Sequence, residues 1–96
     1  MEKSLFTREW QEVVTLLRTL RKERGITQEE LAERIQEPQT FVSKCERGGR
    51  RLDLLEVREF CRAIGVPFVE FVQQLEERLA TLPSEQPRQR RPKRVS

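Results

Sequence analysis

The sequence predicts an all-α fold: a compact five-helix domain over residues 1–82, followed by a basic tail over residues 83–96. Its 96 residues suit one small hydrophobic core and are few for the separate substrate and cofactor domains of most enzymes. Glycine (4 residues) and proline (5 residues) are scarce, while charged residues make up 36% of the chain, which is typical of helices with solvated faces.

Composition argues against several classes of protein. The chain has no histidine, the usual general base and commonest metal ligand, and its two cysteines, Cys45 and Cys61, lack metal-like spacing. We therefore expect no enzymatic activity, no metal and no cofactor. No apolar run approaches the roughly 18 residues of a membrane span, and residues 1–8 lack a signal-peptide core. We expect a cytoplasmic protein with reduced thiols and no membrane association.

The net charge of +3 is unevenly distributed. Residues 83–96 carry a net +4, so residues 1–82 carry −1, and the overall balance does not indicate that the folded part binds nucleic acid. Two local clusters are basic: Arg18, Arg21, Lys22 and Arg24 in one, and Lys44, Arg47, Arg50 and Arg51 in the other. A surface with a basic edge would orient toward a polyanion.

The first helix is predicted from Thr7, a suitable N-cap, to about Arg24. Its apolar residues have the i, i+3, i+4, i+7 spacing of a buried stripe: Trp10, Val13, Val14, Leu17 and Leu20, with Leu16 at the margin. Gly25 ends the helix, because glycine adopts the left-handed C′ conformation without strain.

A second, shorter helix is predicted to begin at Thr27. Thr27 and Glu30 form a capping box, in which each side chain accepts a hydrogen bond from the other residue's amide. Ile26 and Leu31 are spaced as the accompanying hydrophobic staple. The buried face comprises Leu31, Ala32 and Ile35. A helix of two turns is marginal alone, so it must pack on a partner.

A third helix follows the connection Gln36-Glu37, with Pro38 suited to its first position. Val42 and Cys45 point inward, with Phe41 at the margin. The outward side chains are mostly hydrogen-bonding groups: Gln39, Thr40, Ser43, Lys44 and Arg47. Such groups can pair with base edges in the major groove, glutamine with adenine and lysine with guanine. An ordinary solvated face is the alternative.

Asp53 and Glu56 form a second capping box, which predicts a fourth helix to about Ile64. Its buried side comprises Leu54, Leu55, Val57, Phe60, Cys61 and Ile64. Both cysteines of the chain lie on apolar stripes, where a thiol usually acts as a small hydrophobe rather than a redox sensor. Gly65 ends this helix.

The last helix is predicted from Pro67 to Leu82. We expect Phe68, Phe71 and Val72 to pack in the core. Further along, Leu75, Leu79 and Leu82 exceed what so small a core needs, so we expect them to form a dimer contact. Ordinary core packing with a frayed end is the alternative.

Residues 83–96, with three prolines and little apolar content, predict a disordered basic tail. We expect it to add non-specific affinity through phosphate contacts. A solvated terminus and a segment that binds a protein or RNA partner are the alternatives.

Two segments at a fixed offset then indicate a family. Arg-x-x-x-Gly-x-Thr-Gln-Glu-Glu-Leu-Ala begins at Arg21, and Ser-Lys-x-Glu-Arg-Gly begins at Ser43. Together they resemble the lambda-repressor-like helix-turn-helix family, also called the XRE or Cro type, over roughly Leu17 to Pro67. The resemblance implies that the helix-turn-helix core is residues 27–47, whose second helix lies in the major groove of double-stranded DNA.

The resemblance also implies roles for individual residues. Base contacts match Gln39, Thr40 and Lys44, with Ser43 able to reach base or phosphate. Phosphate contacts match Thr27 and Gln28 at the start of the first short helix, and Arg47, Arg50 and Arg51 around the following loop. Gln28 also matches the glutamine that braces the base-contacting Gln39.

Two further positions are structural in the family. Arg21 and Glu46 match a buried ion pair that joins the first helix to the end of the recognition helix, so we exclude Arg21 from the DNA contacts. In the turn, the family usually has glycine and then an apolar residue, where this chain has Gln36 and Glu37. We expect Pro38 to help define an altered but still short turn.

Two functions follow from these observations. The first is a sequence-specific transcriptional regulator, a homodimeric repressor that acts on a palindromic operator. The second is an antitoxin-like interaction module, which holds another protein through its last helix or tail and for which DNA binding is secondary.

Overall fold

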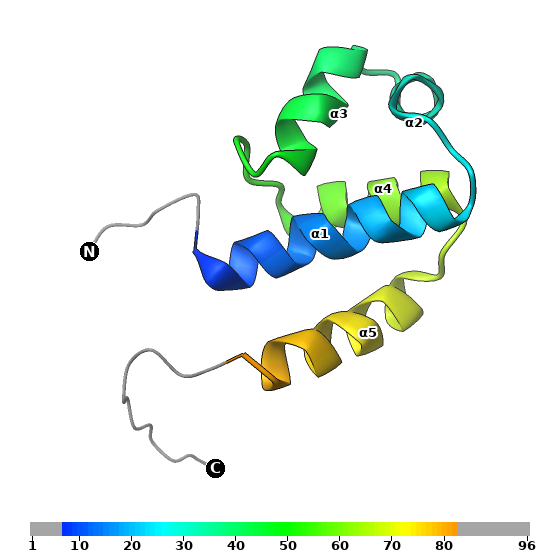
Figure 1. Cartoon of the computed structure of the whole chain (residues 1–96). Helices are drawn as coiled ribbons and strands as arrows, with labels where there is room; N and C mark the ends of the chain where they lie inside the picture. The colour runs from blue at the N-terminus through cyan, green and yellow to red at the C-terminus, as the bar shows by residue number, and fades with distance from the viewer. Residues whose placement is uncertain (1–6, 83–96) are drawn as a thin grey trace.

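The computed structural model describes residues 7–82, which form five α-helices. Their bounds are Arg8–Glu23 (α1), Gln28–Ile35 (α2), Gln39–Glu46 (α3), Leu54–Ile64 (α4) and Phe68–Ala80 (α5). Helix α1 is central and packs against α3, α4 and α5, while α2 packs against α3 and α4. The α2–α3 pair and α5 lie on opposite sides of α1 (Figure 1). The predicted five-helix fold is confirmed, and residues 83–96, the predicted tail, lie outside the described residues.

The predicted caps explain where the helices begin. The Thr7 hydroxyl accepts from the Trp10 amide at 3.0 Å. In the α2 capping box, the Glu30 amide donates to the Thr27 hydroxyl at 3.0 Å, and the Thr27 amide donates to the Glu30 carboxylate at 2.9 Å. Asp53 and Glu56 form the same box at α4. Because each box satisfies two otherwise unpaired amides, these starting positions are determined locally.

The two prolines were predicted one position too far into their helices. Pro38 and Pro67 are the N-cap residues of α3 and α5, so the helices begin at Gln39 and Phe68. Pro38 has the extended backbone of an N-cap, with φ −67° and ψ 154°. Neither proline can offer a capping hydroxyl or carboxylate, and no side-chain cap is present at either helix.

The core contains most of the predicted stripes of α1, α2 and α3, and the half-buried Val13 and Ile35 pack against it. Leu16, expected at the margin, is fully buried with its neighbour Leu17. Both thiols are buried, and desolvation raises the pKa of Cys45 and of Cys61 to about 11. At neutral pH both therefore remain protonated, in the role of small hydrophobes.

The prediction for the start of α4 was wrong. Leu54 and Leu55, expected in the core, are 68% and 72% exposed. Leu55 lies two residues before the buried Val57, and two residues correspond to about 200° around a helix, so it faces away. The buried place at this helix start belongs to Leu52, which has the N′ position of a hydrophobic staple with Val57 at N4.

Helix α5 ends at Ala80, before the predicted Leu82, and the burial of its side chains also differs from the prediction. Phe71 is buried and Phe68 half-buried, but Val72 is 43% exposed and the neighbouring Val69 is 69% exposed. The distal leucines are all half-buried: Leu75, Leu79 and Leu82. Leu75 packs against the core of its own chain. The large exposed apolar side chains in the described part of the chain are therefore on the first turn of α4 and the first two turns of α5.

Candidate nucleic-acid interface

A buried ion pair joins α1 to the end of α3. The Arg21 guanidinium donates to the Glu46 carboxylate through Nε at 2.7 Å and Nη2 at 2.9 Å, a bidentate arrangement. Its Nη1 donates to the Ile26 carbonyl at 2.6 Å. The two charged side chains are only 7% and 5% exposed. Arg21 is thus fully engaged inside the protein, which gives it a structural role.

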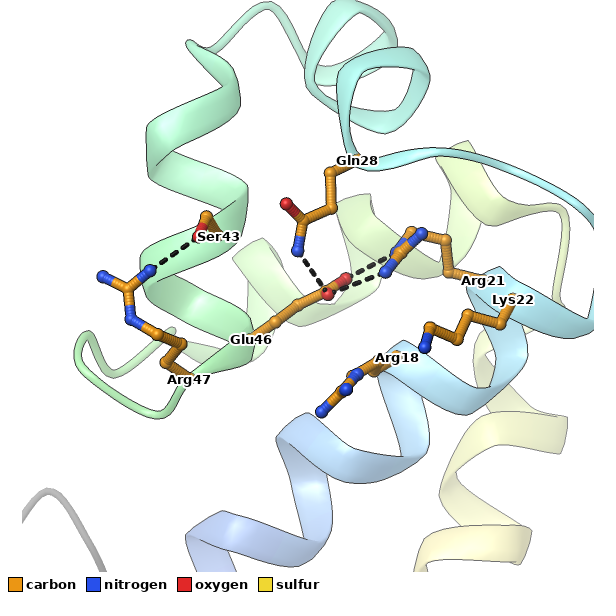
Figure 2. Close-up of a pocket in the computed structure, with 7 residues that line it drawn as sticks. All are labelled: Arg18, Arg21, Lys22, Gln28, Ser43, Glu46 and Arg47. Carbon is orange, nitrogen blue, oxygen red and sulfur yellow. Dashed lines mark hydrogen bonds and ion pairs between the residues drawn. The ribbon is translucent and has the colours of Figure 1, made fainter.

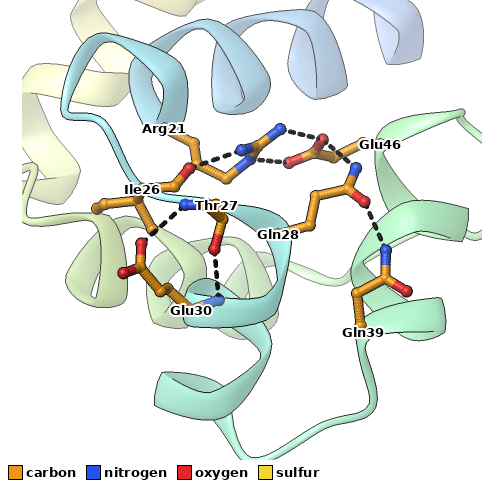
Figure 3. A network of polar contacts seen from close by, with 7 residues as sticks. All are labelled: Arg21, Ile26, Thr27, Gln28, Glu30, Gln39 and Glu46. Atoms are coloured by element: carbon orange, nitrogen blue, oxygen red, sulfur yellow. Dashed lines mark hydrogen bonds and ion pairs between the residues drawn. The ribbon is translucent and has the colours of Figure 1, made fainter.

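A chain of hydrogen bonds continues from this pair to the surface of α3 (Figure 3). Gln28 Nε2 donates to Glu46 Oε1 at 2.9 Å, and Gln39 Nε2 donates to Gln28 Oε1 at 2.7 Å. Since a carboxylate only accepts, Gln28 must present its amide nitrogen to Glu46 and its oxygen to Gln39. Gln39 must then donate one N–H to Gln28.

This chain fixes the orientation of the Gln39 amide. Within the described residues, Gln39 retains its own Oε1 and a second N–H for another partner. One acceptor and one donor side by side on an amide is the pattern that pairs with the major-groove edge of adenine. A carboxylate inside the protein thus determines which hydrogen-bonding groups α3 presents outside it.

The other predicted base-contacting residues also lie on α3. Thr40 and Lys44 are exposed, one helical turn apart. Ser43 is half-buried, and its hydroxyl accepts from Arg47 Nη1 at 2.6 Å. The structure thus brings Gln39, Thr40, Ser43 and Lys44 onto one short helix.

The turn between α2 and α3 is short, as expected. Gln36 has a left-handed backbone, with φ 60° and ψ 45°, at the position where glycine would be unstrained. For a residue with a Cβ this costs about 1 kcal/mol. The Glu37 amide donates to the Ala32 carbonyl at 2.9 Å, which closes the C-terminus of α2.

The predicted phosphate-contacting residues differ in the contacts that they already make within the protein. Thr27 uses its hydroxyl as the α2 cap. Arg47 is exposed and donates to Ser43, a neutral group. The Arg51 guanidinium lies over the Trp10 ring, 5.1 Å from its centroid.

Arg50 forms an ion pair that was not predicted from the sequence. Its guanidinium donates to the Glu56 carboxylate at 3.2 and 3.3 Å and lies 5.0 Å from the centroid of the Phe41 ring. The backbone N–H of Asp53 and then Arg50 lower the pKa of Glu56, and the bond to Glu56 raises the pKa of Arg50. Because Arg50 precedes the helix in an irregular loop, no periodic pattern in the sequence indicates this contact.

Comparisons with known proteins agree with the helix-turn-helix fold. The helix-turn-helix family model HTH_3 matches residues 17–71. An uncharacterized HTH-type transcriptional regulator, y4dJ, from Sinorhizobium fredii is 40% identical over 58 residues, which cover 60% of this chain and 75% of that protein.

Two solved structures are also similar. An XRE-family-like protein from Pseudomonas syringae pv. tomato is 44% identical with a TM-score of 0.69, covering 73% of this chain and 85% of that one. The restriction-modification controller protein C.Esp1396I is 25% identical with a TM-score of 0.73, covering 79% of this chain and all of that one. It has also been solved as a tetramer in complex with its natural 35 base-pair operator. The chain therefore belongs to the XRE-type helix-turn-helix family of DNA-binding transcriptional regulators.

Proposed function

We propose that this regulator is a homodimeric repressor that recognises a palindromic operator through α3 in the major groove. It acts by occupying the operator and excluding RNA polymerase, so no bond is made or broken. The observation that carries the proposal is the orientation of the Gln39 amide by Gln28 and Glu46, because a base-contacting group gains specificity when it is held in place before binding.

In this proposal the exposed face of α3 contacts bases. Gln39 contacts adenine, Lys44 contacts guanine, and Thr40 and Ser43 contact neighbouring base edges or phosphates. Phosphates are bound by Thr27 and Gln28 at the α2 N-terminus, and by Arg47, Arg50 and Arg51 near the α3–α4 loop. Arg50 must exchange its Glu56 partner for a phosphate to take part.

Selection of genomic DNA fragments bound by the protein tests the proposal directly. We expect an enriched palindrome whose half-sites are about one helical turn apart, roughly 34 Å. On that operator, alanine at Gln39, Thr40 or Lys44 should each weaken binding by about 1–3 kcal/mol while binding to random DNA stays nearly constant. Equal losses on both DNAs would exclude base recognition by these residues.

The dimer contact is proposed on the distal part of α5 and the two residues that follow it. Leu75, Leu79 and Leu82 are half-buried, so each has apolar surface left for a second copy. Leu79→Glu should produce a monomer in sedimentation at micromolar concentration, while Gln73→Glu, which introduces the same charge at an exposed position of the same helix, should not. A wild-type protein that sediments as a monomer both free and on its operator would exclude the homodimer.

A second candidate function is the antitoxin-like interaction module. The observation in its favour is the exposure of four large apolar side chains, Leu54, Leu55, Val69 and Val72, because exposed apolar surface often marks a partner site. A stoichiometric protein partner recovered from the native host, together with no enriched DNA site, would favour this function over repression.

The proposal also covers the cellular location of the protein and the role of residues 83–96. We assign the regulator to the bacterial cytoplasm, where its operator would be accessible; the named relatives with a stated source are bacterial. In residues 7–82, no helix has the length and apolar character needed to span a bilayer. Residues 83–96 are proposed to add non-specific phosphate contacts or to bind a protein partner.

A further inference from the structure

We propose that a surface pocket between α1 and α3 binds a backbone phosphate of the DNA duplex, with Arg18 and Lys22 of α1 as its ligands. The inference rests on the DNA binding proposed above and adds α1 to the elements that contact the duplex. The pocket has a volume of about 240 Å³ and is lined by Arg18, Arg21, Lys22, Gln28, Ser43, Glu46 and Arg47 (Figure 2).

The acidic group in this pocket is already neutralised. Both oxygens of the Glu46 carboxylate are occupied, Oε2 by Arg21 Nε, and Oε1 by Arg21 Nη2 and Gln28 Nε2. The bidentate pair with Arg21 cancels its charge over a short distance. An anion that enters the pocket therefore meets no uncompensated negative charge from its lining.

The remaining charges in the pocket are all positive. Arg18 and Lys22 are exposed, four residues apart on α1, and their charged ends extend into the space beside the Glu46 carboxylate (Figure 2). Among residues 7–82 neither has a hydrogen-bond or ion-pair partner. Like charges at this spacing repel each other on a helix, and a bound anion would relieve that repulsion. Arg47 adds a third cation, which within the described part of the chain is bonded only to the neutral Ser43.

The lining indicates a phosphodiester rather than a whole nucleotide or an apolar ligand. None of the seven lining residues is aromatic or aliphatic, so the pocket offers no surface on which a base could stack. The same pocket includes Gln28, Ser43 and Arg47, which are proposed to contact DNA from α2 and α3. A phosphate held there would belong to the DNA strand that borders the major groove occupied by α3.

The test compares two double variants that remove the same charge at the same helical spacing. Arg18→Ala/Lys22→Ala removes the pocket cations, and Arg58→Ala/Arg62→Ala removes two exposed arginines of α4, which contributes nothing to the pocket. Dissociation constants are measured against salt concentration on a selected operator and on a random duplex. A charge-retaining variant, Arg18→Lys/Lys22→Arg, serves as the rescue.

We expect the pocket variant to lower the slope of log K against log salt by about one and to weaken binding about tenfold at 0.1 M salt, equally on both duplexes. The α4 control and the rescue variant should retain the wild-type slope. A pocket variant that behaves like the α4 control would overturn the phosphate site while leaving the proposed function intact. A loss of affinity for the operator alone would overturn the phosphate site in favour of base recognition. Failure of the wild type to bind any duplex would overturn both proposals.

Discussion

Two of the arginine–glutamate pairs in this small domain have the same chemistry and different surroundings. Arg21 and Glu46 are 7% and 5% exposed and are joined at 2.7 Å, whereas Arg50 and Glu56 are 40% and 38% exposed and are joined at 3.2 Å. The first pair has lost its water and depends on its partner. The second pair remains hydrated, so its members can exchange partners.

The difference in exposure predicts a structural role for the buried pair and a role in binding for the exposed pair. The buried pair connects α1 to α3 and orients Gln28 and Gln39, so its effect reaches the surface only through other side chains. The exposed pair lies beside the α3–α4 loop, where Glu56 also completes the α4 capping box. Breaking the first should damage the fold, and breaking the second should mainly change what Arg50 can bind.

The largest expected effect is on folding. Replacing Glu46 with alanine leaves the Arg21 charge buried without a partner, so the free energy of unfolding should fall by about 3–5 kcal/mol. Urea denaturation measures it. Arg50→Ala is the matched control at the exposed pair. It should lower the free energy of unfolding by about 0.2–1 kcal/mol, and by less at high salt. Equal losses at both pairs would contradict the comparison.

The next largest effect is on the base preference of Gln39, which the buried pair orients through Gln28. Gln28→Ala breaks the hydrogen-bond chain but leaves the Arg21–Glu46 pair intact, so stability should fall by only about 1 kcal/mol. Released from Gln28, the Gln39 amide can rotate, and the preference for adenine at one operator position should weaken. Binding to operators that vary at that position measures the preference. An unchanged preference would show that Gln39 is not oriented through this chain.

A smaller effect is expected from freeing Arg50. Glu56→Gln retains an acceptor for the Asp53 amide, so the capping box survives while the charge disappears. Arg50 then has no competing carboxylate, and the affinity for random duplex DNA should rise by about two- to fivefold at low salt. In the double variant Arg50→Ala/Glu56→Gln this gain should vanish; a gain that persists would assign it to the lost negative charge alone.

The smallest effect is on pH dependence. The Asp53 amide and Arg50 lower the pKa of Glu56 in the folded state, so its ionised form contributes stability above the unfolded-state pKa. That contribution is lost as pH falls through the lower, folded-state pKa. The difference in unfolding free energy between wild type and Glu56→Gln should therefore shrink as urea titrations move from pH 7 into the acid range. A constant difference would contradict the lowered pKa.

Local chemistry explains which elements the sequence predicts well. Capping boxes at Thr27 and Asp53 and the glycine at position 25 act within four residues, so the helix ends follow from neighbours in the chain. The motif around Arg21 and Glu46 likewise indicates the family. The same local rules started two helices one residue too early, at Pro38 and Pro67, because the restricted φ of proline fits both the N-cap and the first helical position.

Tertiary packing decided what the periodic patterns left open. Leu54 and Leu55 match an apolar stripe but are exposed, because Leu52 fills the place beside Val57. The Arg50–Glu56 pair forms only when the α3–α4 loop folds back on α4. The joint position of Arg18, Lys22 and Arg47 arises only when α1 packs beside the end of α3. The sequence by itself determined the helices, the family and the outward set on α3, since these depend on short-range spacing. Apart from the Arg21–Glu46 pair that the family resemblance implies, only the folded chain decided which charges of residues 7–82 are neutralised and which stay exposed, since packing selects the partner of each charged side chain.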